Sequence, residues 1–358
     1  MTLESLLVED FRCVERAELA LHPRFNLLSG ENASGKTTLL EAMFFLGRGR
    51  SFRAPRAEDL IRATANGFQL VARIAGREGS GRPLGIRVQR TGMEIRYSGR
   101  PVSAMVELAT VLPVQAIDPE VHRLIDGGPQ ERRRFLDWGV FHVEPGFIAH
   151  WRRYQRALRQ RNAALKAEQP EHLVRIWDKD LLEAGKEVAR QRERYLLALA
   201  PHVAAVAERL LGSPVELTMA RGWSSDRSLE EAVAAAWGRD RARGLTHCGP
   251  HRADLVVRFE GSIARDRVSR GQQKLVAASL LLGQLHCDAS LGSELAALLV
   301  DDPAAELDET HLRRLLSEVS ALPAQLIVTA LDASVPALRE LPEGHWFHVE
   351  RGAVRRLL

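Results

Sequence analysis

The chain has 358 residues, of which 45% are hydrophobic and 27% charged, a composition ordinary for a soluble globular protein with two or three domains. No apolar run approaches the length of a membrane span, and three widely spaced cysteines exclude a disulfide framework, so we expect a cytoplasmic protein with no membrane partner. The net charge of only +4 is weak support for a polyanionic partner.

The first third of the chain predicts strands around one glycine-rich turn. A helix is predicted at 37–46, where apolar residues recur at helical spacing. Alternating or short apolar runs predict strands at 3–8, 16–21, 25–28, 68–75, 84–90 and 93–97.

From about 120 to 240 the pattern is mostly helical. Two long antiparallel helices are predicted, broken near Pro170, and either a short coiled-coil arm or a plain helical bundle fits their apolar spacing. Residues 212–238 are expected to be a less regular tail. Strands and helices alternate afterwards, with strands predicted at 254–260, 295–300, 325–329, 345–350 and 353–357 and helices at 272–287 and 308–320.

Residues 30–37 match the phosphate-binding pattern G-x-x-x-x-G-K-[ST] at every fixed position. Glycines let backbone N–H groups approach phosphates, and the N-terminus of the following helix favours an anion. We expect Lys36 to reach the β- and γ-phosphates of ATP and Thr37 to bind Mg²⁺. The predicted nucleotide-binding residues are Gly30, Glu31, Asn32, Ala33, Ser34, Gly35, Lys36, Thr37 and Thr38.

A phosphate-binding loop of this kind works together with an apolar strand that ends in acidic residues, which bind Mg²⁺ beside the phosphates. Residues 298–302 have this pattern, and they end in Asp301 and Asp302. We expect Asp301 to hold Mg²⁺ and Asp302 to polarise the attacking water, so that Lys36 and Asp302 are catalytic. Paired carboxylates at a strand end can also be simple turn residues.

Ser269, Arg270, Gly271 and Gln272 open a predicted helix and resemble the signature motif of ABC ATPases. In that superfamily the signature of one subunit faces the γ-phosphate held by the P-loop of the other. Gln115 resembles the catalytic glutamine that senses Mg²⁺, and residues 305–308 resemble the D-loop. For Ser269 the alternative is an ordinary helix cap.

These motifs predict an α/β fold: an ABC-type P-loop ATPase head of two lobes with a mixed sheet, into which a mostly helical, SMC-like arm is inserted. The expected domains are 1–115, the N-terminal part of the ATPase with the P-loop; 116–240, the helical insertion; and 241–358, the C-terminal part with the signature, the acidic strand and the D-loop.

Further motifs extend the resemblance over nearly the whole chain. The Gly-Pro-His-Arg run at 249–252 and the three arginines at 132–134 are not general features of P-loop proteins. Together with segments 6–12, 26–37, 49–53, 269–274 and 299–308, they resemble the RecF family of bacterial recombination mediators.

The resemblance implies a protein of DNA repair and replication that responds to DNA damage. It implies binding of ATP and Mg²⁺, an ATP-dependent homodimer, binding of duplex DNA and single/double-strand junctions, and loading of RecA at gaps with RecO and RecR. A weak, DNA-stimulated ATPase that acts as a switch is expected, because Asp302 stands where transporters have Glu and Thr329-Ala330 stands where many relatives have a switch histidine. The alternative is another SMC-like or ABC-type head that serves as a structural DNA scaffold.

Arginines crowd two loops and one predicted helix, and phosphate contacts of this kind make DNA binding sensitive to salt and tolerant of sequence. A solvated helix face is the alternative. Arg12 is expected to contact the nucleotide or to be a structural ion-pair partner, and His251 to line the nucleotide side or to be a core histidine. The candidate DNA contacts are Arg50, Arg53, Arg132, Arg133, Arg152, Arg153, Arg156 and Arg159.

Overall fold

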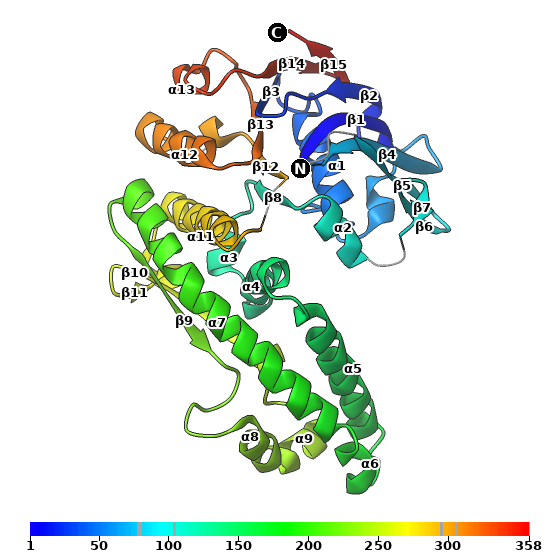
Figure 1. The fold of residues 1–358 in the computed structure, drawn as a ribbon, viewed down its shortest axis with the longest axis vertical. Helices are drawn as coiled ribbons and strands as arrows, with labels where there is room; N and C mark the ends of the chain where they lie inside the picture. Colours follow the sequence, from blue (N-terminus) through cyan, green and yellow to red (C-terminus); the bar gives the residue numbers. More distant parts are fainter. Residues whose placement is uncertain (77–80, 103–104, 294–295, 306, 358) are drawn as a thin grey trace. The chain divides into compact units, whose positions relative to one another are not determined.

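A computed structural model describes residues 1–76, 81–102, 105–293, 296–305 and 307–357 (Figure 1). The chain forms two compact units, one made of Met1–Val121 with Glu294–Leu358 and the other of His122–Ser293. The first segment of unit 1 carries the P-loop and the second carries the acidic strand, so the nucleotide motifs at 30–37 and 298–302 fold together.

Unit 1 contains a mostly parallel sheet whose inner strands are buried on both faces, which explains why these strands are mainly apolar. All five residues of β3 and all four of β12 are buried. Only the last pair, β14 with β15, is antiparallel. The strand order is β15-β14-β3-β13-β12-β8, with bounds Phe25–Ser29 (β3), Val114–Ile117 (β8), Ala297–Val300 (β12), Gln325–Ala330 (β13), His345–Glu350 (β14) and Ala353–Arg356 (β15).

A second, antiparallel sheet alternates buried and exposed residues, as a sheet with one solvated face does. This alternation is what made its strands predictable at 68–75, 84–90 and 93–97. The order is β2-β1-β4-β5-β6-β7, with bounds Thr2–Phe11 (β1), Val14–Ala20 (β2), Gly67–Ala75 (β4), Arg82–Gln89 (β5), Gly92–Tyr97 (β6) and Arg100–Pro101 (β7).

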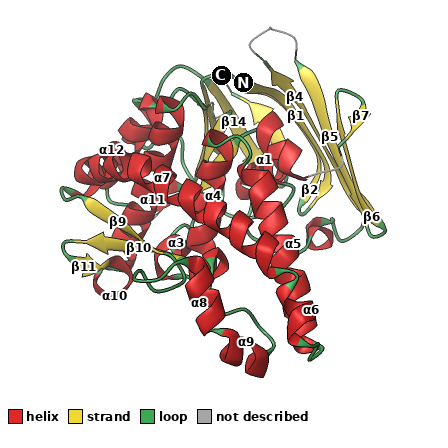
Figure 2. Ribbon diagram, turned by 60° about the horizontal axis from the view of Figure 1, so that its bottom comes forward, coloured by secondary structure: helices red, strands yellow, loops and turns green. Residues whose placement is uncertain are grey.

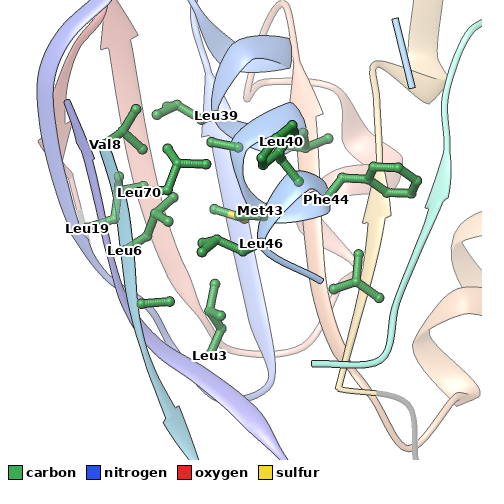
Figure 3. Packing of buried hydrophobic residues seen from close by; sticks show 14 of the residues in the cluster. Leu3, Leu6, Val8, Leu19, Leu39, Leu40, Met43, Phe44, Leu46 and Leu70 are labelled. Carbon is green, nitrogen blue, oxygen red and sulfur yellow. The ribbon is translucent and has the colours of Figure 1, made fainter. Parts of the chain in front are cut away.

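Helix α1 (Lys36–Arg48) is the centre of the core of unit 1. Leu39, Met43 and Leu46 pack in one cluster with Leu6 and Leu70 of the antiparallel sheet (Figure 3). Because α1 is apolar nearly all round, its position is fixed by packing on several sides, and so is the P-loop at its N-terminus. The remaining helical segments are Ala57–Leu60 (η1), Met105–Val111 (α2), Pro303–Ala305 (η3), Glu309–Ala321 (α12) and Pro336–Arg339 (α13).

Unit 2 is mostly helical, with one small antiparallel sheet of order β11-β10-β9 (Figure 2). Its strands are Val215–Ala220 (β9), Asp254–Phe259 (β10) and Ser262–Ile263 (β11). Its helices are Arg123–Asp126 (α3), Pro129–Val143 (α4), Phe147–Lys166 (α5), Glu171–Arg175 (α6), Asp178–Leu211 (α7), Leu229–Ala235 (α8), Trp237–Arg243 (α9), Pro250–Arg252 (η2), Ala264–Arg267 (α10) and Arg270–Ser290 (α11).

The two long helices of the expected arm are α5 and α7, which lie side by side with α6 at their turn (Figure 1). The break near Pro170 is confirmed. The expectation of a less regular tail over 212–238 was wrong, because that segment contains β9, which pairs along its length with β10.

The expected boundary between 240 and 241 does not coincide with the division of the chain. Residues 241–293 belong to unit 2, where β10 pairs with β9 and α11 packs along α7. No helix in the described ranges is both long enough and apolar enough to cross a membrane.

Candidate nucleotide site

The P-loop connects the end of β3 at Ser29 to the start of α1 at Lys36. Gly35 caps the helix in the left-handed conformation, with φ 113°, which glycine adopts without strain. No side chain caps α1 and no acidic residue lies in its first turn. The first N–H groups of the helix therefore remain as donors for an anion, as the motif predicts.

Lys36 is held inside the loop that precedes it. Its Nζ donates hydrogen bonds to the carbonyl oxygens of Gly30, at 2.6 Å, and Glu31, at 2.8 Å. Burial lowers the pKa of Lys36, and the nearby carboxylates of Asp302 and Asp301 oppose that shift. The lysine lies at the helix end, where phosphate oxygens can take the place of the two carbonyls.

The hairpin of β14 and β15 supports the P-loop. The Gly352 N–H donates to the Ser34 carbonyl at 2.8 Å, and Ser29 Oγ donates to the Phe347 carbonyl at 3.1 Å. A Cβ atom at Gly30 would lie 2.2 Å from the Val349 carbonyl oxygen, so only glycine fits there. The C-terminal segment thus sets the shape of a loop more than 300 positions earlier in the chain.

The two predicted magnesium ligands meet across 264 positions of sequence. Thr37 Oγ1 donates to Asp301 Oδ1 at 3.0 Å, which places a hydroxyl and a carboxylate beside the P-loop. Hydroxyl and carboxylate oxygens are ligands that Mg²⁺ prefers. These residues therefore fit the ion that the motif implies.

Asp302 follows at the same strand end. Its backbone has a φ of +42°, and its N–H donates to Thr329 Oγ1 at 2.8 Å. The assignment of Asp302 to water activation stays a prediction.

Gln115, the predicted magnesium-sensing glutamine, is bonded to an arginine of α1. It lies inside β8, opposite Leu298, and its Oε1 accepts a hydrogen bond from Arg48 at 2.6 Å. Asp301 lies further along, where its N–H donates to the Ile117 carbonyl at the end of β8. In this arrangement the Gln115 amide holds the half-buried Arg48 side chain, and a catalytic role of Gln115 stays a prediction.

Glu41 was missed by the sequence analysis. It is fully buried on α1 and accepts hydrogen bonds from Arg12 Nη2, at 2.8 Å, from Arg12 Nε and from Ser51 Oγ. Arg53 Nη1 lies 3.9 Å from its carboxylate. The sequence feature that could have indicated this role is a single acidic residue within the apolar run of the helix after the P-loop.

This ion pair bears on Arg12 and Arg53, both predicted as ligand contacts. The guanidinium of Arg12 is engaged with Glu41, which satisfies the structural alternative, while Arg53 keeps an exposed side chain. Nucleotide contact by Arg12 remains a prediction.

The signature residues lie in unit 2, at the start of α11. Ser269 Oγ accepts a hydrogen bond from the Gln272 N–H at 3.3 Å, and Gln272 Oε1 accepts one from the Ser269 N–H at 3.0 Å. The helix-cap role of Ser269 is therefore real. Ser269, Arg270, Gly271 and Gln272 are all exposed, which leaves the motif accessible to a partner. Of the expected D-loop, Glu306 lies outside the described residues.

Two candidate DNA contacts, Arg132 and Arg133, make hydrogen bonds to other residues of unit 2. Arg132 is 5% exposed, pairs with both carboxylate oxygens of Asp254 at 2.8 and 3.0 Å, and donates to the Ile125 and Gly127 carbonyls. Arg133 donates to the Ala253 carbonyl at 2.6 Å. Arg132 is therefore withdrawn as a DNA contact, because removing its buried charge from Asp254 would be costly.

The four candidate arginines of α5, at 152, 153, 156 and 159, are exposed, but they are not equivalent. Arg153 pairs with Asp180 and Glu183 of α7, each at 2.6 Å. Arg152, Arg156 and Arg159 follow one another at i, i+4 and i+7, so they share one face of the helix. Within the described part of the chain, these three have no ion-pair partner.

His251 is half-buried, and both of its ring nitrogens have hydrogen-bond partners. Its Nδ1 shares a 2.5 Å hydrogen bond with Tyr154 Oη and its Nε2 lies 3.0 Å from the Thr246 carbonyl. Burial lowers the pKa of His251 to about 4, so the ring is neutral. The Gly-Pro-His-Arg run therefore joins α5 to the segment before β10.

A P-loop backed by an acidic strand, with a serine-capped signature helix in a second unit, defines an ATPase head of the ABC and SMC class. The family model described as the RecF/RecN/SMC N terminal domain matches residues 2–340. The chain belongs to the RecF family of DNA replication and repair proteins.

Curated relatives named DNA replication and repair protein RecF match over their full length. Those from Erwinia tasmaniensis and Pectobacterium atrosepticum are 38% and 39% identical, over 99% of this chain and 98% of each relative. Among solved structures, the recombination mediator RecF with ATP covers 100% of this chain and 98% of its own, with a TM-score of 0.89 at 24% identity. An Smc head bound to the C-winged helix domain of ScpA covers 100% and 97%, with a TM-score of 0.64 at 16% identity. The structural likenesses support the ABC-type, SMC-like fold.

Proposed function

We propose that this protein is an ATP-dependent DNA-binding protein of recombinational repair and replication, and that it works as a slow switch. The observation that carries the proposal is the meeting of Thr37 and Asp301 beside Lys36, at a helix start whose N–H groups have no capping side chain. This arrangement suits the phosphates of ATP with Mg²⁺.

Each residue of the site has a separate task in the proposal. The P-loop N–H groups and Lys36 bind and orient the phosphates, and Thr37 and Asp301 hold Mg²⁺. The ion supplies charge neutralisation at the phosphates when it is bound. Asp302 orients the attacking water, and its short side chain accounts for slow turnover.

The exposed signature at Ser269 supports an ATP-dependent homodimer. One copy binds ATP in its P-loop, and Ser269 to Gln272 of the second copy complete the site around the γ-phosphate. Under this proposal unit 1 is the nucleotide-binding lobe, while residues 122–293 supply the signature and the helical arm.

DNA binding is assigned to the exposed arginines. Arg152, Arg156 and Arg159 of α5 form one face of unpaired positive charge within the described residues, and Arg50 and Arg53 add exposed charge in unit 1. Such side chains contact phosphates and not bases. Duplex DNA and single/double-strand junctions are the proposed substrates. RecR with RecO, and through them RecA, are the proposed partners in the cytoplasm. Membership of the RecF family and the solved structures of RecF as a recombination mediator of the RecFOR pathway support this proposal.

The first experiment is nucleotide binding by the Lys36→Met variant. We expect it to abolish ATP binding, because the buried cation at the phosphates is lost. Lys186→Met is the matched control, since Lys186 is an exposed lysine that pairs with Glu230, and it should bind ATP normally. Sedimentation of the wild-type protein with ADP, ATP and gapped duplex then tests the dimer. ATP binding by Lys36→Met, or a wild-type monomer under all conditions, would contradict the proposal.

A further inference from the structure

Thr329 lies near the carboxyl end of β13 and is fully buried. Strands β12 and β13 pair in parallel with Val300 opposite Val328, so the next residues, Asp301 and Thr329, also lie beside each other. Thr329 Oγ1 donates to Asp301 Oδ1 at 2.7 Å and accepts a hydrogen bond from the Asp302 N–H at 2.8 Å. One hydroxyl thus joins the side chain of the first acidic residue to the backbone of the second.

Two hydroxyls hold the carboxylate of Asp301 in one orientation. Thr37 and Thr329 both donate to Oδ1, and no hydrogen bond from the described residues reaches Oδ2. A carboxylate with both donors on one oxygen has little freedom to rotate, and its second oxygen is left for a cation. Because the Thr37 hydroxyl donates its hydrogen bond to Asp301, the lone pairs of its oxygen are left for the same cation.

The turn at Asp302 depends on the same threonine. Its φ of +42° is a conformation that non-glycine residues rarely adopt. The Thr329 hydroxyl accepts from the N–H of this residue, and the Ala305 N–H donates to its carbonyl at 3.2 Å. The two contacts hold the N–H and the carbonyl of Asp302, and they thereby fix the direction in which its side chain leaves the backbone.

We infer that Thr329 is a positioning residue for the magnesium site, whose hydroxyl orients Asp301 and fixes the Asp302 turn. The inference rests on the proposed function, because it concerns binding of Mg²⁺ with ATP. It also revises the sequence expectation for this position. Thr329 and Ala330 stand where a switch histidine is expected, but both are buried, and the Thr329 hydroxyl is directed to the acidic strand.

The test is the Mg²⁺ dependence of ATP binding by Thr329→Val, which keeps the shape of the side chain and removes the hydroxyl. The half-saturating Mg²⁺ concentration should rise about 10- to 100-fold, as is typical when a residue that supports a metal ligand is lost. Binding of ATP in the presence of EDTA should match the wild-type protein. Thr329→Ser restores the hydroxyl and should restore the Mg²⁺ requirement to within about threefold.

Val328→Ala is the matched control, since it removes buried methyl groups from the same strand without touching the hydroxyl. It should lower the melting temperature and leave the Mg²⁺ requirement unchanged. A wild-type requirement in Thr329→Val, or a raised requirement in Val328→Ala, would overturn the inference. If Thr329→Val does not fold, Thr329→Cys takes its place, with an intermediate Mg²⁺ requirement expected and a wild-type one contradicting the inference. Failure of the wild-type protein to bind ATP would instead refute the proposed function.

Discussion

Asp288, near the end of α11, is a buried carboxylate outside the nucleotide site. It is 7% exposed, and Tyr195 Oη donates to its Oδ1 at 2.6 Å. Burial raises the pKa of Asp288 to about 7, against an ordinary value of 3.8. The folded protein therefore keeps this proton at pH values where the unfolded chain has released it.

This difference predicts a pH-dependent stability that the Asp288→Asn variant should lose. Because the folded pKa is raised, the contribution is fully present below pH 4 and is lost as the pH rises toward about 7. By linkage it amounts to at most about 4 kcal/mol. Urea unfolding should show Asp288→Asn gaining stability relative to the wild-type protein between pH 5 and pH 8.

Tyr195→Phe provides the control for this prediction. It removes the hydrogen bond and leaves the carboxylate buried, so the pH dependence should keep its sign. Equal differences in the free energy of unfolding between Asp288→Asn and wild type at both pH values would show that Asp288 is ionised in the folded protein.

At the scale of the element, α5 presents two kinds of arginine. On the buried side of α5, Arg161 is fully buried and forms ion pairs with Asp178 and Asp240, each at 2.8 Å. Its outer face carries Arg152, Arg156 and Arg159, which are exposed. A stretch rich in basic residues and without acidic ones therefore contributes arginines both to the interior and to the surface.

Replacing Arg152, Arg156 and Arg159 together by Gln should weaken duplex binding and its dependence on salt. Each lost phosphate contact lowers the slope of log K against log salt by about 1, so a fall of up to about 3 is expected. Fluorescence anisotropy over a series of salt concentrations measures it.

Arg153→Gln is the matched control, because Arg153 is on the same helix but pairs with Asp180 and Glu183. Its salt slope should change by less than about 0.5. An unchanged slope in the triple variant would remove α5 from the proposed DNA surface.

For the whole molecule, the P-loop and the signature lie in different units of the chain. The dimer proposal requires the signature of one copy to complete the nucleotide site of the other. Ser269→Arg places a bulky cation at the start of α11, so this variant should bind ATP with wild-type affinity and remain monomeric in sedimentation with ATP.

Ser269 also caps α11, so the Ser269→Arg variant loses a helix cap. The control variant must lose a helix cap as well. Ser228 caps α8 with a capping box of the same kind, in which Glu231 N–H donates to Ser228 Oγ at 3.2 Å. Each variant should lose about 1 kcal/mol of helix stability, but Ser228→Arg should still dimerise. If Ser269→Arg dimerises as well, the proposed site between two copies is wrong.

The sequence was sufficient for the elements whose signal is local. The P-loop, the acidic strand and the ATPase-head fold follow from short patterns, because phosphate binding needs a strand, a glycine turn and a helix start within a few residues. The strands of the antiparallel sheet followed from alternation, because one face is buried. The strand β9 was missed, since its pairing with β10 lies across the helices α8 and α9.

The tertiary structure alone decided which charged and hydroxyl side chains are available to a ligand. Arg132 and Arg152 look alike in sequence, yet one is buried against Asp254 and the other is exposed. Thr329 was noted only as standing in place of a switch histidine, and Glu41 was not noted at all. Thr329 donates to Asp301, and Glu41 accepts from Arg12. Such pairs form between segments that are far apart in the chain. A single sequence does not show which of these segments the fold brings into contact.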